Sequence, residues 1–283
     1  MKKIFFALCL FFALPNVQAQ TVDDVINHFI EANGGLEKLS SITSLQIESE
    51  MNLEQMGTTV SIKSFKEKNK LFRMQSSSPM SEGESFTVVT DTAGYTFVPA
   101  MNSPMGSTEA SLTKFTEEEF KAANYQKDCE GFFAPLVNYK EKGYTATLDG
   151  TEKVNGVECD KVILKLNTGQ EMTYYISKAN AQVRRLSVAA PIALDMMGMS
   201  AMRRGFGGGG GERRRPDGEG KNGERRRGNS ERKIDIDYEK YKLFNGIPFP
   251  TRQTLQLGMM QLQLDNLSIK INEPINKRWY LVQ

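Results

Sequence analysis

The sequence predicts a mainly β fold, built as one curved antiparallel sheet or a half-open β-barrel, with an N-terminal helix and a second short helix as a lid. Apolar and polar residues alternate in about ten short segments, which is typical of strands with one buried face. The pair Asn155-Gly156 joins two of these segments, and Asn-Gly is the strongest short signal for a hairpin turn. Helical spacing is confined to two short segments. Many strands with few helices favour a sheet that curls or closes on itself.

The composition is that of a globular protein and leaves little room for catalysis. Of 283 residues, 39% are hydrophobic and 25% are charged, and the net charge is +2, which is ordinary for a folded domain. A single histidine, His28, excludes sites that need several histidines, and any Ser-His-Asp arrangement would depend on it. Because His28 falls outside the apolar stripe of its helix, we expect it to face solvent. We expect no catalytic residues, metal site, cofactor or enzymatic activity.

The first residues have the pattern of a secretory signal peptide. Two lysines precede the apolar run Ile4–Leu14, and a small-residue cleavage site ends at Ala19. We therefore expect a signal peptide over 1–19, export to the periplasm or cell envelope, and a single domain over 20–283. Lipid attachment at Cys9 is the alternative, but it would cut the apolar run in half.

Two segments are predicted to be helices. Thr21 can cap the first together with Asp24, and Gly34-Gly35 ends it. A short helical turn over 36–42 then leads into the sheet. The second helix, over 116–125, begins with three glutamates, which suits a helix N-terminus. The apolar residues of the first helix recur at helical spacing: Val22, Val25, Ile26, Phe29 and Ile30.

The predicted strands follow from alternation with a period of two. In the last hairpin, Leu262 and Leu264 share one phase, whereas Ile269 and Ile271 have the opposite phase, which predicts a β-bulge between them. The predicted strands are 45–53, 60–62, 72–74, 87–89, 95–97, 144–154, 157–166, 172–176, 183–188, 234–239, 255–257 and 260–271.

Two cysteines remain after the signal peptide, Cys129 and Cys159. In an oxidising compartment such a pair is interpreted as a disulfide. Closing a loop of about 30 residues would stabilise the fold by about 3–4 kcal/mol in the chain-entropy model. The alternative is two buried thiols that pack as small apolar side chains.

A basic, glycine-rich segment interrupts the strands at Arg203 to Lys233. It holds ten glycines and eleven basic residues against five acidic ones, so we expect a disordered insert. The apolar stretch 190–202 precedes it, and this combination can hold a segment at an anionic membrane surface. The alternatives are an acidic protein partner or a solvated spacer. No nucleic-acid partner is expected of an exported segment.

Methionine is unusually frequent, with 14 residues. Met196, Met197, Met199 and Met202 lie close together in the sequence. Three interpretations are open: packing in the core, an adaptable apolar surface for a ligand, or thioether binding of Cu(I).

Several motifs, in order along the chain, resemble the LolA-like outer-membrane lipoprotein-sorting proteins, a superfamily of periplasmic lipoprotein carriers. Segment 25–45, which contains INHFIEANGGLEKLSSITSL, resembles their opening helix, Gly-Gly pair, Glu-Lys-Leu turn and first strand. Further similarities lie at 135–143 (PLVNYKEKG), 155–156 (NG), 173–176 (TYYI) and 245–250 (NGIPFP). The basic insert departs from the family pattern.

The resemblance implies a half-open antiparallel barrel with helices across its mouth and an apolar cavity for acyl chains. We therefore expect a periplasmic, non-enzymatic carrier of lipoprotein or lipid acyl chains that serves envelope lipoprotein sorting. The alternative is an envelope scaffold that uses the barrel for protein interactions without a lipid cargo. The resemblance supplies no ligand residue, so the expected cavity residues come from the apolar patterns alone: Phe29, Ile30, Leu45, Ile47, Met51, Val60, Ile62, Phe72 and Met74.

Overall fold

A computed structural model describes residues 20–53, 57–79, 81, 83–103, 106–199, 232–258 and 260–282. The predicted signal peptide and nearly all of the predicted insert, residues 203–231, lie outside this range and remain predictions. Within the described range, no helix is long and apolar enough to cross a membrane.

The described residues form a mainly β structure with a few short helices, which confirms the predicted fold class. The strands are β1 (Ser44–Leu53), β2 (Thr58–Glu67), β3 (Leu71–Ser77), β4 (Glu84–Val89), β5 (Gly94–Val98), β6 (Met101–Ser103), β7 (Gly106–Thr108), β8 (Ser111–Lys114), β9 (Thr145–Val154), β10 (Val157–Lys165), β11 (Glu171–Ser177), β12 (Val183–Ala189), β13 (Lys233–Phe244), β14 (Ile247–Leu257) and β15 (Met260–Ile271). The helices are α1 (Val22–Ala32), α2 (Leu36–Ser40), α3 (Glu117–Ala123) and α4 (Ala190–Met196), with 3₁₀ turns η2 (Asn124–Lys127), η3 (Ala134–Leu136) and η4 (Lys277–Tyr280).

One antiparallel sheet of 13 described strands dominates the fold, in the order β8-β5-β4-β3-β2-β1-β15-β14-β13-β12-β11-β10-β9. Neighbours in the sheet are neighbours in the chain with two exceptions: β1 pairs with the last strand, β15, and β5 pairs with β8. The sheet is therefore a meander whose first and last strands meet in its middle, and it stays open between β8 and β9. Strands β6 and β7 form a separate small hairpin.

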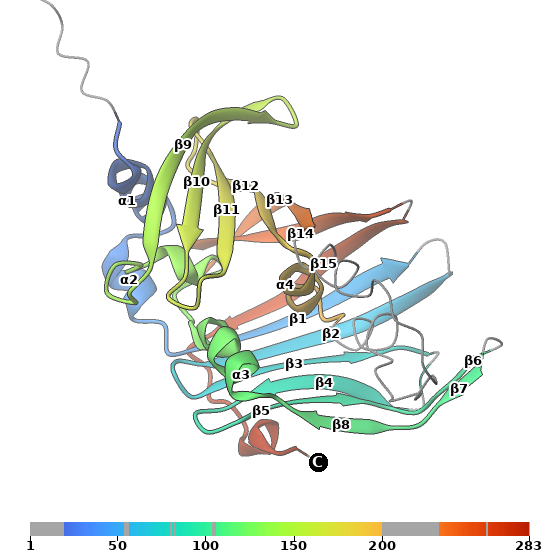
Figure 1. The fold of residues 1–283 in the computed structure, drawn as a ribbon. Helices are drawn as coiled ribbons and strands as arrows, with labels where there is room; N and C mark the ends of the chain where they lie inside the picture. Colours follow the sequence, from blue (N-terminus) through green and yellow to red (C-terminus); the bar gives the residue numbers. More distant parts are fainter. Residues whose placement is uncertain are drawn as a thin grey trace, which may run out of the picture.

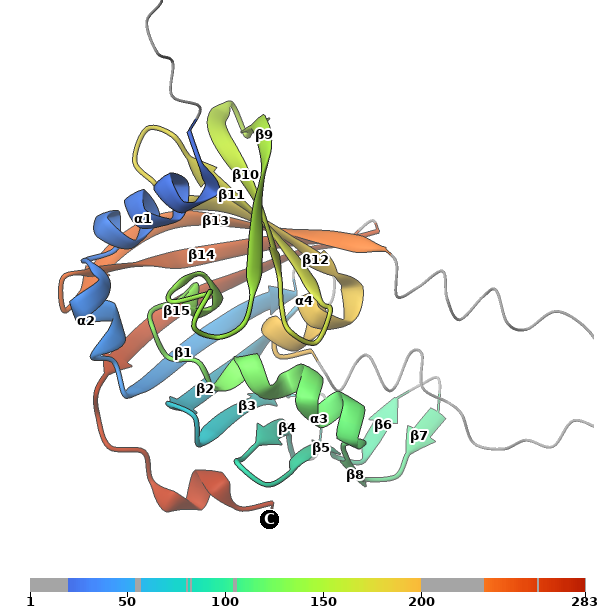
Figure 2. The ribbon, with the colours of Figure 1, turned by 60° about the vertical axis from the view of Figure 1, so that its left-hand side comes forward.

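The sheet is strongly curved (Figures 1 and 2). Its β9–β12 end turns back over its β2–β5 end, and α3 and α4 lie between the two ends. The main apolar core fills this concave side and draws on α1, β1, β10–β15 and the segment between α3 and β9. A sheet that bends this far encloses a core without needing a second sheet.

Helix α1 forms as predicted because both of its ends are specified locally. Thr21 Oγ1 accepts a hydrogen bond from the Asp24 amide at 3.2 Å, and Asp24 Oδ2 accepts one from the Thr21 amide at 2.8 Å. At the other end Gly34 has φ +107° and packs so closely on the β13–β14 turn that an added Cβ would lie 3.4 Å from the carbonyl oxygen of Gly246. His28 is exposed, as expected.

The hairpins and the bulge follow the turn chemistry of the sequence. Asn155 and Gly156 join β9 to β10 with φ values of 49° and 82°, the left-handed conformation that a two-residue hairpin turn requires. Asn245 and Gly246 do the same between β13 and β14. Opposite β1, the pairing skips Leu267, which is 59% exposed, so the predicted bulge is confirmed.

The structure does not show the expected disulfide. Cys129 and Cys159 are both free and buried. Cys129 belongs to the main core on the concave side, whereas Cys159 packs with Val154 and Tyr175 in a small separate cluster. Tyr175 alternates along β11 with the core residue Tyr174, so this cluster lies on the other face of the sheet. The sheet separates the two thiols.

The apolar stretch before the insert is part of the fold, which corrects the idea that all of 190–202 meets a lipid surface. Residues 190–196 form α4, and Pro191 occupies its first turn, where proline is favoured. Ile192, Ala193 and Met197 are buried in the main core. Met199 is 5% exposed. Core packing therefore explains Met197 and Met199 among the clustered methionines, whereas Met202 lies outside the described residues.

Candidate functional site

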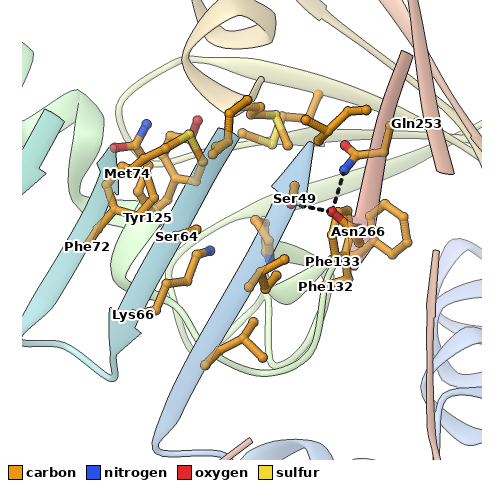
Figure 3. A pocket seen from close by; sticks show the side chains of 18 of the residues that line it. Ser49, Ser64, Lys66, Phe72, Met74, Tyr125, Phe132, Phe133, Gln253 and Asn266 are labelled. Atoms are coloured by element: carbon orange, nitrogen blue, oxygen red, sulfur yellow. Dashed lines mark hydrogen bonds between the residues drawn. The ribbon is translucent and has the colours of Figure 1, made fainter. Parts of the chain in front are cut away.

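A pocket lies on the concave side of the sheet (Figure 3). One wall comes from the adjacent strands β3, β2, β1, β15 and β14, and β11, from nearer the β9 end of the sheet, adds Met172 and Tyr174. Its cover comes from η2, the segment 132–135 and α4. The pocket has a volume of about 100 Å³, which is small beside the range of about 300–1,000 Å³ common for ligand sites.

Five of the nine predicted cavity residues line this pocket: Leu45, Ile47, Ile62, Phe72 and Met74. The other four lie in the core beside it. Phe29, Ile30 and Met51 are buried, and Val60 packs partly exposed against the same core. Phe29 contacts the cover directly, since its ring lies 6.2 Å from the ring of Phe133 in an edge-to-face arrangement.

Two aromatic residues, Phe132 and Phe133, fix the cover to strands β11, β13 and β14. The Phe133 ring packs edge-to-face on Tyr238 at 4.9 Å and on Tyr174 at 6.2 Å between centroids. Phe132 packs on Tyr238 and Phe249 in the same way, at 5.7 and 6.3 Å. Each such aromatic pair contributes about 0.5–1.5 kcal/mol beyond the burial of its area. This side of the cover is therefore firmly held.

A buried polar cluster interrupts the apolar wall where β1 meets β15. Ser49 Oγ donates to Asn266 Oδ1 at 2.8 Å, and Gln253 Nε2 approaches the same oxygen at 3.5 Å (Figure 3). The Asn266 amide donates in turn to the carbonyl oxygen of Pro250 at 2.7 Å. These polar groups satisfy one another, so they can remain inside an apolar site.

Lys66 brings a positive charge into the pocket from β2 (Figure 3). Its Nζ donates one hydrogen bond, to the carbonyl oxygen of Asp128 at 3.2 Å, and lies 5.8 Å from the centre of the Phe72 ring. Burial lowers the pKa of Lys66, because a desolvated site disfavours the ammonium form. The hydrogen bond joins the sheet to the segment that begins the cover.

Behind Lys66, four charged residues form a buried ionic cluster: Asp128, Glu130, Lys68 and Lys142. Lys142 Nζ lies 3.0 Å from Asp128 Oδ2 and 3.2 Å from Glu130 Oε2, and Lys68 lies 2.8 Å from Glu130 Oε1. Burial alone would raise the pKa of Glu130, but the two lysines lower it overall. The pKa of Asp128 is raised, because burial outweighs Lys142 there. The cluster ties 128–142 to Lys68, which directly follows β2.

Tyr125 separates the pocket from two further cavities. It lines the pocket itself, a cavity of about 110 Å³ under α3 and α4, and a more polar cavity of about 520 Å³ beside Lys142 and Asn167. Its neighbour Gln126 lines the first two, and Gln126 Oε1 is buried without a hydrogen-bond partner in the described structure. The turn η2 is thus a thin partition between spaces of different polarity.

Within the described residues, no group of three or more His, Cys, Asp or Glu side chains is placed to hold a metal ion. The pocket combines apolar walls, a few internally bonded polar groups and one partly buried lysine.

Some pocket residues could have been predicted from the sequence, and others could not. Ser49 and Lys66 continue the same alternation that placed Leu45, Ile47 and Ile62 on one strand face, so extending the pattern past its apolar members would have found them. Tyr125 ends the helix predicted over 116–125, and the segment that supplies Phe132 and Phe133 has no strand or helix period; neither sequence indicates which wall these residues cover. Asn266 and Gln253 reach the pocket through the pairing of β1 with β15 and of β15 with β14, whereas Met172 and Tyr174 on β11 reach it through the curvature of the sheet.

Comparison with known proteins identifies the fold but not a close relative. No protein-family model matches this chain, and no curated protein matches its sequence. A solved LolA superfamily protein from Nitrosomonas europaea is 12% identical, covers 92% of this chain and 98% of its own, and has a TM-score of 0.50. A DUF1329 family protein from Desulfovibrio piger is 8% identical over 93% of this chain and 98% of its own, with a TM-score of 0.45. The chain has a LolA-like fold, as its motifs suggested.

Proposed function

We propose that this protein is a non-enzymatic carrier that binds lipid or lipoprotein acyl chains in the cell envelope. The observation that carries the proposal is the apolar pocket between the two ends of one curved sheet. The LolA-like fold and the signal-peptide pattern of residues 1–19 support it, because both suit a protein that shields acyl chains outside the cytoplasm. Each methylene group removed from water contributes about 0.8 kcal/mol to binding.

The pocket must enlarge to take a chain, and the cover is the part that can yield. An acyl chain needs more than the present volume of about 100 Å³. Phe132 and Phe133 are held by several aromatic contacts, whereas η2 is a single 3₁₀ turn between cavities. A displacement of Tyr125 would join the pocket to the two neighbouring cavities. Chain entry therefore proceeds by movement of η2 while the aromatic side of the cover stays in place.

Binding of the neutral fluorescent probe N-phenyl-1-naphthylamine, and its displacement by long-chain lipids, tests the proposal. Met74→Trp places a larger side chain in the pocket and should abolish probe binding, because overpacking leaves no room for a ligand. Leu267→Trp, at a position 59% exposed on β15, is the matched control and should bind like the wild type. If both variants bound the probe equally, the probe would bind outside this pocket, and the proposal would be overturned.

The small volume of the pocket favours one other candidate, an envelope scaffold that uses the same sheet without a lipid cargo. A scaffold would not bind the probe in any of the three proteins, and no long-chain lipid would protect it against thermal unfolding. A carrier would be stabilised by its ligand, by about 2.7 kcal/mol at a free ligand concentration of about 100 times Kd.

A further inference from the structure

The charges around the pocket do not balance. Three lysines gather there, Lys66, Lys68 and Lys142, but only two carboxylates face them, Asp128 and Glu130. Both carboxylates already form ion pairs with Lys68 or Lys142. Lys66 forms no ion pair with any carboxylate of the described residues, and it is the lysine that lines the pocket.

Cys129 does not supply the missing negative charge. Its thiol lies close enough to Lys66 to influence the charge of the amine. However, burial raises the pKa of Cys129 to about 12, so the thiol is neutral at physiological pH. In its ammonium form Lys66 therefore has no negative partner at the edge of an apolar cavity, and an anion beside it would favour that form.

The hydrogen bonds of Lys66 leave room for a partner. A lysine ammonium group has three N–H donors. One is used by the carbonyl oxygen of Asp128 at 3.2 Å, and no other described group accepts from the remaining two. Two free donors on a single nitrogen match the two oxygens of a carboxylate, and a hydrogen bond between two charged groups is about twice as strong as a neutral one.

We propose that the pocket takes a single acyl chain with a free carboxylate, a long-chain fatty acid, whose headgroup pairs with Lys66. This inference rests on the proposed function, since it names the ligand of the same pocket. The chain lies along the apolar wall of Ile47, Ile62 and Met74, and the carboxylate restores charge balance at the ionic cluster. The small pocket suits one chain better than the several chains of a lipoprotein anchor. An anion beside Lys66 also offsets the cost of burying its charge.

Competition for the neutral probe separates the headgroup from the chain. We expect palmitic acid to displace N-phenyl-1-naphthylamine from the wild type at a concentration about tenfold below that of hexadecan-1-ol, which has the same chain without the charge. Lys66→Met should lose the preference for the acid, measured within that variant as the ratio of the acid and alcohol concentrations that displace the probe. Lys66→Arg should keep it.

Lys63→Met is the matched control. Lys63 lies on the same strand, three residues from Lys66, and so on the opposite face of the sheet, away from the pocket. This variant should retain the preference for palmitic acid.

Equal competition by acid and alcohol in the wild type, or an unchanged preference in Lys66→Met, would overturn the inference and leave the carrier function standing. If palmitoyl lysophosphatidic acid displaced the probe at a lower concentration than palmitic acid, the recognised headgroup would be a phosphate, and the proposed preference for a carboxylate would be contradicted. Failure of every lipid to displace the probe would overturn the carrier function itself.

Discussion

The hydroxyl group of Ser49 donates a hydrogen bond to Asn266 Oδ1 at 2.8 Å, and this buried contact joins the first strand of the sheet to the last. It lies next to the bulge at Leu267, where the side chains of β15 change phase. Asn266 also donates to the carbonyl oxygen of Pro250 on β14, so one amide connects three adjacent strands inside the pocket wall.

Asn266→Ala should destabilise the protein by about 2 kcal/mol, because it leaves the Pro250 carbonyl and the Ser49 hydroxyl buried without partners. Ser49→Ala removes only one donor, and Asn266 keeps its bond to Pro250, so its cost should be nearer about 1 kcal/mol. Urea unfolding of both variants measures the difference. A smaller loss for Asn266→Ala than for Ser49→Ala would show that the amide does not organise this junction.

Glu130→Gln should lower the free energy of unfolding by about 3 kcal/mol at pH 7, since the Glu130 side chain is only 4% exposed and Lys68 would lose its ion-pair partner. The exposed pair Glu117–Lys121 on α3 offers the matched control. Glu117→Gln should leave stability unchanged within error, because solvent screens that pair.

The effect of Glu130 should fade in acid. Its pKa is lowered in the folded protein, so its contribution is present above the ordinary value of 4.5 and is lost as the pH falls through the lowered pKa. The stability gap between wild type and Glu130→Gln should therefore narrow below about pH 4.5. Asp128 is present in both proteins and its pKa is raised mainly by burial, although Glu130 adds to that rise in the wild type only. A gap that is constant from pH 7 to pH 3 would contradict an ionic role for Glu130.

Both cysteines should react as free thiols. When the protein isolated from its native compartment is unfolded in guanidinium without a reductant, iodoacetamide should label both Cys129 and Cys159, as mass spectrometry can show. In the folded protein Cys129 should react far more slowly, because the thiol is buried and its pKa is raised to about 12. Labelling that requires prior reduction would mean that the two cysteines are bridged.

The strands were predictable because their signals are local. Alternation located most of the sheet, Asn155-Gly156 located one hairpin, and the phase change around Leu267 located the bulge. The short strands β6, β7 and β8 were not predicted, because three or four residues are too few to show a period of two. The helix predicted over 116–125 is divided, with α3 ending at Ala123 and η2 beginning at Asn124.

The pocket was less predictable because it depends on contacts between distant segments. The apolar face of β1 to β3 could be identified from the sequence, but not the cover that Phe132 and Phe133 place over it. The sequence likewise does not show that Cys129 and Cys159 lie on different faces of the sheet, because their positions depend on how the sheet curves. The apolar stretch 190–202 suggested a lipid surface because no local signal shows that α4 packs back into the core.

Native mass spectrometry of the protein, purified gently from its own compartment, decides whether it carries a lipid. We expect a population whose mass exceeds that of the polypeptide by one long-chain lipid, and we expect Met74→Trp to lack this population. Repeated preparations of the wild type that show only the mass of the bare polypeptide, with no added lipid able to shift it, would contradict a carrier.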